Sequence, residues 1–255
     1  MNTPSLRTEN LTIRFGGHAA VNGVTCAFQP GELTVIVGPN GAGKTTWFNL
    51  VSGQLKPTEG RIFKGDEDIS ALSPSARAKG GIGRAFQLTN LFPKLTVLEN
   101  VRLAVQARAG QGARIFTRAA RLTDIRDKAY GFVEATRLAS VAHLPAAALP
   151  HGDQRKLEVA LLMAMEPDIF MFDEPTAGMS VDEAPAILEL VAELKKDLSK
   201  TILLVEHKMD VVRALADRIV VLHNGELVAD GRPDEVMALP IVREIYLGVG
   251  AEEVA

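Results

Sequence analysis

A glycine-rich octapeptide in the first fifth of the sequence constrains the fold more than any other feature. It follows Leu33–Val37, a short apolar, β-branched run typical of a buried strand, and it precedes residues 45–52, which have the pattern of a helix. Its residues are Gly38, Pro39, Asn40, Gly41, Ala42, Gly43, Lys44 and Thr45. This order of strand, glycine-rich turn and helix predicts an α/β fold with a tight loop at the end of a core strand.

The octapeptide has the composition of a phosphate-binding loop. Glycines let the main chain turn tightly and point successive N–H groups inward, where they can hold phosphate oxygens. The start of the following helix adds a favourable partial charge. Lys44 can then reach the outer phosphates of a nucleotide, and the hydroxyl of Thr45 can hold Mg²⁺. The alternative is a chance match in a glycine-rich turn, and the flanking strand and helix count against it.

Two carboxylates follow a second apolar run. Residues 169–172 have the pattern of a strand, and Asp173 and Glu174 come directly after it. Carboxylates at the end of a buried strand are costly unless positive charge meets them, and Mg²⁺ on the phosphate loop would supply that charge. Asp173 is therefore the expected metal partner, and Glu174 is the expected general base for an attacking water. Without the loop, the pair would indicate only a strand that enters a polar turn.

A histidine stands at the end of a third apolar run. Residues 201–205 precede Glu206 and His207. A lone histidine is more often structural, but the carboxyl ends of core strands in α/β sheets face the ligand crevice. We therefore expect His207 to face the bound nucleotide.

The remaining stretches differ in character. Residues 6–32 alternate apolar and polar types around Gly16-Gly17 and Asn22-Gly23, which predicts short antiparallel strands joined by turns at both places. Residues 98–148 are rich in Ala and Arg, and they predict a mostly helical lobe with a loop or a mobile helix over residues 109–121.

From residue 169 onward, strands and helices alternate. Strands are predicted over residues 169–172, 201–205 and 218–222, and helices over residues 183–198 and 209–216, which favours parallel βαβ units. Asn224-Gly225 predicts a hairpin turn. A final helix is expected to begin at Asp234 and to meet Pro240. The predicted architecture is an α/β core interrupted by a helical lobe.

Composition narrows the class of protein. Of 255 residues, 47% are hydrophobic and 23% are charged, as in ordinary soluble globular proteins. The net charge of −3 gives no electrostatic reason to expect a nucleic-acid partner. The single cysteine, Cys26, cannot form an internal disulfide, which favours a reducing compartment. The longest apolar stretch, residues 159–165, is far shorter than the roughly 20 residues of a membrane span. Any work at a membrane is thus expected to depend on a spanning partner.

Together these motifs resemble the nucleotide-binding subunit of an ABC transporter over essentially the whole chain. Phe15, before two glycines, is similar to the aromatic residue on which adenine stacks in that family. Gln87 resembles the loop glutamine that touches Mg²⁺ and couples to the membrane subunit. Ala177-Gly178-Met179-Ser180, with Asp182, resembles the loop that crosses to the partner subunit. His207 resembles the switch histidine that contacts the γ-phosphate.

The resemblance implies a fold and an activity. The chain is expected to be a single ABC ATPase domain over residues 1–255, with a P-loop (RecA-like) α/β core, an antiparallel β subdomain and an inserted helical subdomain. Residues 1–87 and 165–255 would form the β subdomain and the core, and residues 88–164 the helical subdomain with the signature. The expected substrate is ATP, with Mg²⁺, and the expected activity is ATP hydrolysis.

The residues implied at the site form three groups. The catalytic residues are Lys44, Glu174 and His207. The metal-binding residues are Thr45, Gln87 and Asp173. The nucleotide-binding residues are Phe15, Gly38, Pro39, Asn40, Gly41, Ala42, Gly43, Lys44, Thr45, Thr46 and Gln87.

A finer resemblance is to the ATPases of branched-chain amino acid importers. It is carried by residues 11–17, 20–22 and 95–101, by the Arg-rich insertion around residues 112–128, and by the ending Tyr246-Leu247-Gly248. It implies the uptake of branched-chain amino acids or of related amino acids, amides or urea. It also implies a second ATPase subunit, identical or different, two membrane-spanning permease subunits and, indirectly, a periplasmic solute-binding protein. The chain would then work at the cytoplasmic face of the inner membrane, with a docking groove near Gln87 through Pro93.

One motif departs from the family pattern. The family signature, Leu-Ser-Gly-Gly-Gln, is expected just before Arg155 and Lys156, where this sequence has Leu149, Pro150, His151, Gly152, Asp153 and Gln154. In the family, the signature binds the γ-phosphate of ATP held by the opposite subunit. Pro150 removes a hydroxyl and an N–H donor, and Asp153 places a carboxylate near that phosphate. Either the main chain suffices for binding, or this chain completes a weak site on its partner.

Three other functions stay open as alternatives. One is the ATPase of a lipopolysaccharide-type exporter, which the long insertion disfavours. Another is an ABC ATPase outside transport, in Fe–S assembly, DNA repair or translation, which the absence of a basic face or a second ATPase domain in the sequence disfavours. The third is a regulatory module that binds nucleotide without hydrolysis, and Glu174 and His207 argue against it.

Overall fold

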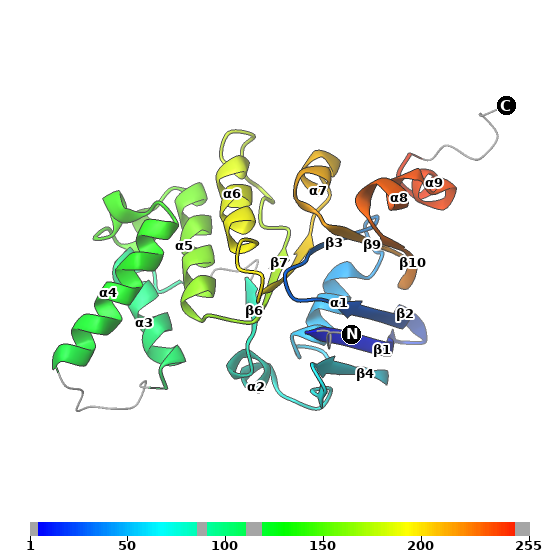
Figure 1. The fold of residues 1–255 in the computed structure, drawn as a ribbon, viewed down its shortest axis with the longest axis horizontal. Helices are drawn as coiled ribbons and strands as arrows, with labels where there is room; N and C mark the ends of the chain where they lie inside the picture. Colours follow the sequence, from blue (N-terminus) through cyan, green and yellow to red (C-terminus); the bar gives the residue numbers. More distant parts are fainter. Residues whose placement is uncertain (1–4, 86–90, 111–118, 248–255) are drawn as a thin grey trace. The chain divides into compact units, whose positions relative to one another are not determined.

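The computed structural model describes residues 5–85, 91–110 and 119–247, which fall into two compact units (Figure 1). The described part of the first unit comprises residues 5–82, 168–174 and 194–247. The second comprises residues 83–85, 91–110, 119–167 and 175–193. Gln87 and much of the Arg-rich insertion, residues 111–118, lie outside the described residues. Each unit has an apolar core of its own.

The central sheet has the strand order β10-β9-β3-β8-β7-β6. Its middle strand, β3 (Leu33–Val37), pairs in parallel with β8 (Thr201–Val205) and with β9 (Arg218–His223), and β8 pairs in parallel with β7 (Ile169–Asp173). Every residue of β3, β7 and β8 is buried. Strands that are covered on both faces have continuous apolar sequences, and the sequence predicts these strands correctly to within one residue. β6 (Ile82–Ala85) was not predicted.

A second, antiparallel sheet has the order β2-β1-β4-β5 and includes the N-terminal strands. These strands are β1 (Leu6–Phe15), β2 (His18–Phe28), β4 (Glu59–Lys64) and β5 (Glu67–Asp68). Gly16-Gly17 forms the turn between β1 and β2, as predicted. The predicted turn at Asn22-Gly23 is wrong, because both residues lie within β2, where the register shifts. Gly23 has φ 63°, and its N–H donates to the hydroxyl of Thr12 at 2.8 Å, so the glycine forms a bulge in a continuous strand.

The C-terminal elements agree with the sequence except at one proline. Asn224-Gly225 joins β9 to the antiparallel β10 (Glu226–Gly231), and both turn residues have positive φ, 50° and 81°. The predicted helix from Asp234 corresponds to α8 (Pro233–Ala238). Pro240 does not only end that helix: it begins another, α9 (Pro240–Leu247). The first position of a helix suits proline, because its fixed φ is helical and no N–H is needed there.

The core of the first unit lies between the two sheets and around α1 (Lys44–Val51), the helix that follows the glycine-rich loop. Trp47 and Phe48 are buried on α1, and the Trp47 ring lies 5.4 Å from the ring of Phe28 on β2. Two short helices, α2 (Pro74–Lys79) and α7 (Met209–Leu215), complete this unit together with α8 and α9 (Figure 1). Burial of α1 fixes the end of the loop that precedes it.

The second unit is helical, as predicted for residues 98–148. α3 (Val97–Arg108), α4 (Ala119–Ala135) and α5 (His151–Ala164) pack side by side (Figure 1), and two single 3-10 turns, Ala139–Val141 and Ala146–Ala148, connect α4 to α5. α6 (Ala184–Leu194) ends four residues earlier than predicted. Within the described residues, none of the helices combines the length and the apolar character needed to cross a membrane.

Candidate functional site

The glycine-rich loop runs from the end of β3 to the start of α1 in the first unit. Two of its glycines lie too close to neighbouring main chain to carry a side chain. A Cβ atom on Gly38 would collide with the carbonyl oxygen of Leu222, and one on Gly43 would collide with that of Ala20. Gly43 also has φ 97° and is the N-cap residue of α1. The loop is thus held between β2 and β9 in a shape that only glycine permits at these two positions.

Lys44 begins α1 and turns back into the loop. Its side chain is buried, and Nζ donates to the carbonyl oxygens of Gly38 at 2.7 Å and Pro39 at 3.0 Å. Burial lowers the pKa of the Lys44 ammonium, and the carboxylates of Glu174 and Asp173 act in the opposite direction. Thr45 is exposed and Thr46 is half-buried. The loop therefore has a cation inside it and a hydroxyl at its surface.

The acidic pair lies where β7 ends. Asp173 is the last residue of β7 and is 4% exposed, and in the register of the sheet it stands opposite Val205 of β8, which in turn stands opposite Ile36 of β3. The carboxyl ends of the three strands thus meet at one edge of the sheet. The Coulombic influence of Asp173 and Glu174 on Lys44 places both carboxylates within electrostatic range of the loop.

Glu174 has an unusual main-chain conformation. Its φ is 51°, in the left-handed region that residues other than glycine rarely adopt. Its N–H donates to the carbonyl oxygen of Val205 at 3.1 Å. Its carboxylate lies 2.7 Å from Nε2 of His207. Such a conformation typically costs on the order of 1–3 kcal/mol and is concentrated at functional sites. The strain therefore indicates that the orientation of the Glu174 carboxylate is important for function.

The other residues predicted at the site lie in different parts of the chain. Phe15 ends β1, opposite His18 in the hairpin, and is 50% exposed. Gln87 lies outside the described residues. In the second unit, α5 begins at His151, and Pro150 is its N-cap residue with no side-chain hydrogen bond to the helix. Among the described residues, the structure therefore brings the loop, Asp173, Glu174 and His207 together within the first unit.

The altered signature has compensating contacts of its own. The Asp153 carboxylate forms an ion pair with Lys156 at 2.8 Å, within the first turns of α5. Gly152 is buried, and a Cβ atom there would lie 2.8 Å from a carboxylate oxygen of Glu183. Glu183 also accepts from the hydroxyl of Ser180 at 3.1 Å. The start of α5 is therefore lined by the loop that carries Ser180.

Sequence reasoning gave no role to two buried polar residues. The carboxylate of Glu206, which is 3% exposed, accepts a hydrogen bond from the N–H of His207 at 3.1 Å and so helps to fix the histidine. Asn100 on α3 is 1% exposed and bonds to the loop that precedes this helix. The position of Glu206 next to His207 in the sequence is a signal that could have predicted its contact. The sequence around Asn100 carries no such signal.

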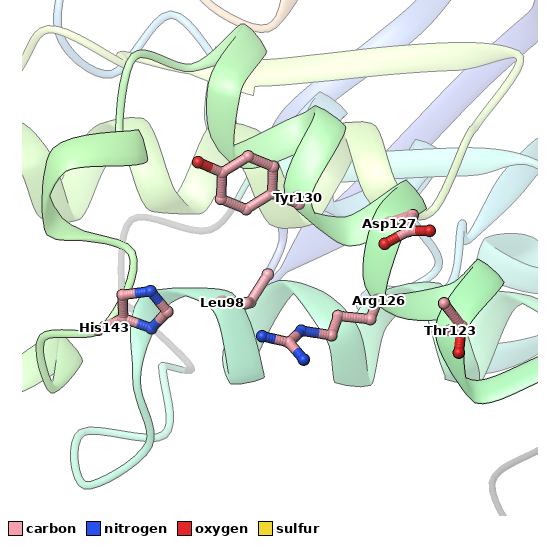
Figure 2. A pocket seen from close by; sticks show the side chains of 6 residues that line it. All are labelled: Leu98, Thr123, Arg126, Asp127, Tyr130 and His143. Carbon is pink, nitrogen blue, oxygen red and sulfur yellow. The ribbon is translucent and has the colours of Figure 1, made fainter. Parts of the chain in front are cut away.

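The described residues of the second unit line two hollows. One, of about 500 Å³, is largely apolar in its lining, which comprises Phe92, Asn100, Leu103, Ala104, Gln106, Ala107, Leu161 and Met165. The other, of about 430 Å³, is lined by Leu98, Thr123, Arg126, Asp127, Tyr130 and His143 (Figure 2). The polar side chains of the second hollow are exposed, and none of the predicted site residues lines it.

The fold and the loop define the class of protein. A parallel sheet whose middle strand leads through a glycine-rich loop into a buried helix, with carboxylates at the ends of neighbouring strands, is the arrangement of P-loop nucleotide-binding proteins.

Comparisons with known proteins narrow this class to one family. The family model described as ABC transporter matches residues 21–177. The high-affinity branched-chain amino acid transport ATP-binding protein LivG of Escherichia coli (strain K12) is 38% identical, over 97% of this chain and 99% of the relative. The chain belongs to the ABC transporter family, and it is an ATPase of that family.

Solved structures agree with the fold. The ADP conformation of MJ1267, an ATP-binding cassette of an ABC transporter, has a TM-score of 0.82 and 31% identity, over 97% of this chain and 100% of that chain. The dimeric MJ0796, a bacterial ABC transporter cassette, has a TM-score of 0.75 and 28% identity, over 89% and 98%. The predicted P-loop α/β fold and the predicted family are thereby confirmed.

Proposed function

We propose that this chain hydrolyses MgATP to drive the uptake of branched-chain amino acids, or of a related amino acid or amide, through an importer. The close relationship to LivG along nearly the whole of both chains supports this substrate class. The observation that carries the catalytic part is the contact of 2.7 Å between Glu174 and His207, which follow β7 and β8, the next two strands after β3 in the sheet order. The solute itself would be recognised elsewhere in the complex.

We assign the roles at the site as follows. Lys44 exchanges its bonds to the carbonyl oxygens of Gly38 and Pro39 for bonds to the β- and γ-phosphates. The N–H groups of residues 38–46 hold the remaining phosphate oxygens. Phe15, whose ring is half exposed at the tip of its hairpin, stacks on adenine. Burial of Lys44 in the loop and exposure of Phe15 support these two assignments.

The donor set fits Mg²⁺. The Asp173 carboxylate and the Thr45 hydroxyl are hard oxygen donors, which Mg²⁺ prefers, and Asp173 is a buried carboxylate near the loop. When bound, Mg²⁺ would neutralise charge on the phosphates. Gln87, outside the described residues, is proposed as a further oxygen donor to the ion.

Glu174 and His207 share the chemical step. Glu174 accepts a proton from the water whose oxygen attacks the γ-phosphorus. As that bond forms, the bond from the γ-phosphorus to the bridging oxygen breaks, and ADP and phosphate are released. His207, held through its N–H by Glu206, keeps the Glu174 carboxylate in place and then contacts the γ-phosphate. The step therefore needs the strained direction of Glu174 as well as its charge.

The complete site is proposed to include a second ATPase subunit. The dimeric form of MJ0796 supports such an assembly, and the start of α5 would face the nucleotide of the opposite subunit. The main-chain N–H groups of His151 and Gly152 would bind the γ-phosphate there. The ion pair between Asp153 and Lys156 compensates part of the carboxylate's charge, so we propose that the main chain suffices despite Pro150.

Docking to one of the two permease subunits is proposed at the apolar hollow on the second unit. Its lining of Phe92, Leu103 and Met165 with small alanines suits a short amphipathic helix that inserts one apolar face. We propose that the chain works in this way at the cytoplasmic face of the membrane. A periplasmic solute-binding protein would deliver the solute to the other side of the permease.

The catalytic proposal is tested on this chain assembled with its second ATPase subunit. Glu174→Gln keeps the size of the side chain but removes the base, and it should lower MgATP turnover by at least about 100-fold. Binding of a fluorescent ATP analogue should stay within about twofold of wild type, because the phosphate loop is unchanged. The matched control is Asp127→Asn, an exposed carboxylate on α4, which should leave turnover unchanged. Full turnover by Glu174→Gln would contradict the assignment of the base.

A further inference from the structure

Asn100 is a buried polar residue whose hydrogen bonds all go to one loop. It lies on α3 and is 1% exposed. Its side-chain carbonyl accepts from the N–H of Phe92 at 2.8 Å. Its amide donates to the carbonyl oxygens of Phe92 at 3.1 Å, Leu95 at 3.3 Å and Thr96 at 2.9 Å. Both polar main-chain groups of Phe92 thus bond to one side chain, and the carbonyl oxygen of Phe92 also accepts from the N–H of Leu95 at 3.1 Å.

The rest of this loop is held by other contacts. Thr96 and Glu99 form a capping box at the start of α3. The N–H of Ala146 donates to Leu95 at 2.9 Å, and that of Ala147 donates to Pro93 at 3.0 Å. These bonds fix residues 93–96, but for the N–H of Phe92 the described contact is the one to Asn100. The main-chain position of Phe92, and with it the orientation of its ring, therefore depends on Asn100 more than on the helix cap.

Phe92 is a large apolar side chain held at the surface. It is 56% exposed and lines the apolar hollow of about 500 Å³, which Asn100 also lines. Other lining side chains come from α3, such as Leu103, and from α5, such as Leu161. Aromatic side chains are enriched at protein interfaces, where a few anchors that fill pockets contribute most of the binding energy.

We propose that Asn100 is the positioning residue of the permease-docking hollow: it orients Phe92 so that the ring contacts an apolar helical segment of the permease. The inference rests on the proposed docking at this hollow. Asn100 is not among the residues assigned to the nucleotide, so the proposed effect is on coupling to transport and not on the chemical step. Its burial in a satisfied network means that the effect comes through Phe92.

The test compares three substitutions. Asn100→Ser shortens the side chain and removes the clamp on Phe92. Phe92→Ala removes the ring but leaves the clamp. Thr136→Val is the matched control, because Thr136 is also buried in the second unit, donates only to the carbonyl oxygens of Phe132 and Val133 at the end of α4, and does not line the hollow. Each variant is measured for thermal midpoint, for MgATP turnover of the ATPase pair without permease, and for affinity for the purified permease pair in detergent.

Asn100→Ser and Phe92→Ala should each weaken permease binding by about tenfold, as expected for loss of an anchor. The double substitution should weaken it no further, because both act through the same ring. Turnover of the ATPase pair without permease should stay within about twofold of that of Thr136→Val. Normal permease binding by Asn100→Ser, or full additivity with Phe92→Ala, would overturn the inference.

A measurement on the wild-type chain keeps the test independent of folding of the variants. The N–H of Phe92 should exchange slowly with solvent in the free subunit although its ring is exposed, since it donates to a buried carbonyl. Rapid exchange would show that the clamp is not formed and would overturn the inference. Failure of the underlying proposal looks different: Phe92→Ala would then leave permease binding unchanged, and docking at this hollow would be wrong as well.

Discussion

At the scale of single residues, the main-chain conformation of Glu174 fixes the position of the proposed general base. Glu174 has φ 51° and is held by bonds on both sides, from its N–H to Val205 and from its carboxylate to His207. The left-handed conformation costs a residue with a side chain more than it costs glycine. The fold therefore stores strain at the residue proposed as the general base.

This strain predicts a trade between stability and activity. Glu174→Gly should raise the free energy of unfolding by about 1 kcal/mol, because strain relief exceeds the extra flexibility of glycine in the unfolded chain. Turnover should be lost with the carboxylate. Urea denaturation measures the first quantity. Glu189→Gly in the middle of α6 is the control and should lower stability by about 1 kcal/mol. A Glu174→Gly variant less stable than wild type would contradict the account.

Cys26 provides a prediction about pH. Burial, and then the Asp230 carboxylate, raise the pKa of its thiol from 9.0 to about 12. Because the folded-state pKa lies above the unfolded one, this contribution to stability is fully present below pH 9.0 and is lost as the pH rises toward 12. Iodoacetamide should therefore leave the folded protein unmodified at about pH 8.5 and label it in denaturant. In alkaline titrations, Cys26→Ser should lose less stability than wild type; an equal loss would contradict this.

At the scale of elements, the helix behind the phosphate loop is closed by one buried arginine. Arg77 of α2 is 2% exposed. It donates to the carbonyl oxygens of Leu50 at 2.6 Å and Val51 at 2.8 Å, at the end of α1, and also to that of Ser70 at 2.9 Å. A cation at the end of a helix satisfies free carbonyls and complements the helix dipole.

Loss of this cap should be costly. Arg77→Met should lower the free energy of unfolding by about 3 kcal/mol, because it leaves several buried carbonyl groups without their charged donor. The control is Arg61→Met, whose exposed side chain pairs with Asp68 at 3.9 Å and should change stability by less than about 0.5 kcal/mol. Both are measured by chemical denaturation. Equal effects of the two substitutions would show that burial of Arg77 contributes nothing.

The sequence predicts the elements whose pattern is local and misses those that depend on distant contacts. β3, β7, β8 and β9 are short buried runs and were predicted to within one residue. Asn22-Gly23 has turn composition but lies in a bulge, where Gly23 is fixed by Thr12 on the neighbouring strand. The same holds for side chains: the loop and the Asp173-Glu174 pair are contiguous motifs, whereas the partners of Asn100 and Arg77 become visible only in three dimensions.

At the scale of the whole molecule, the effect of the altered signature can be measured as ATP turnover of the assembled transporter. Pro150→Ser restores the hydroxyl of the family pattern at the start of α5. If the main chain suffices, ATP turnover of the assembled transporter should change by less than about twofold. Adding Asp153→Asn should not raise it further, since Lys156 already pairs with that carboxylate. A doubling of turnover or more would mean that the signature of this chain limits the opposite site.

The central claim is that hydrolysis at Glu174 drives amino-acid uptake. It is tested most directly by reconstituting the chain with its second ATPase subunit, the permease pair and the solute-binding protein in liposomes that contain MgATP, and by following uptake of labelled leucine. Wild type and Asp127→Asn should accumulate leucine only with ATP inside. Glu174→Gln should lower the rate by at least about 100-fold while the complex stays assembled. Unchanged uptake by Glu174→Gln, or wild-type ATP hydrolysis without uptake of any branched-chain amino acid or related amide, would contradict the claim.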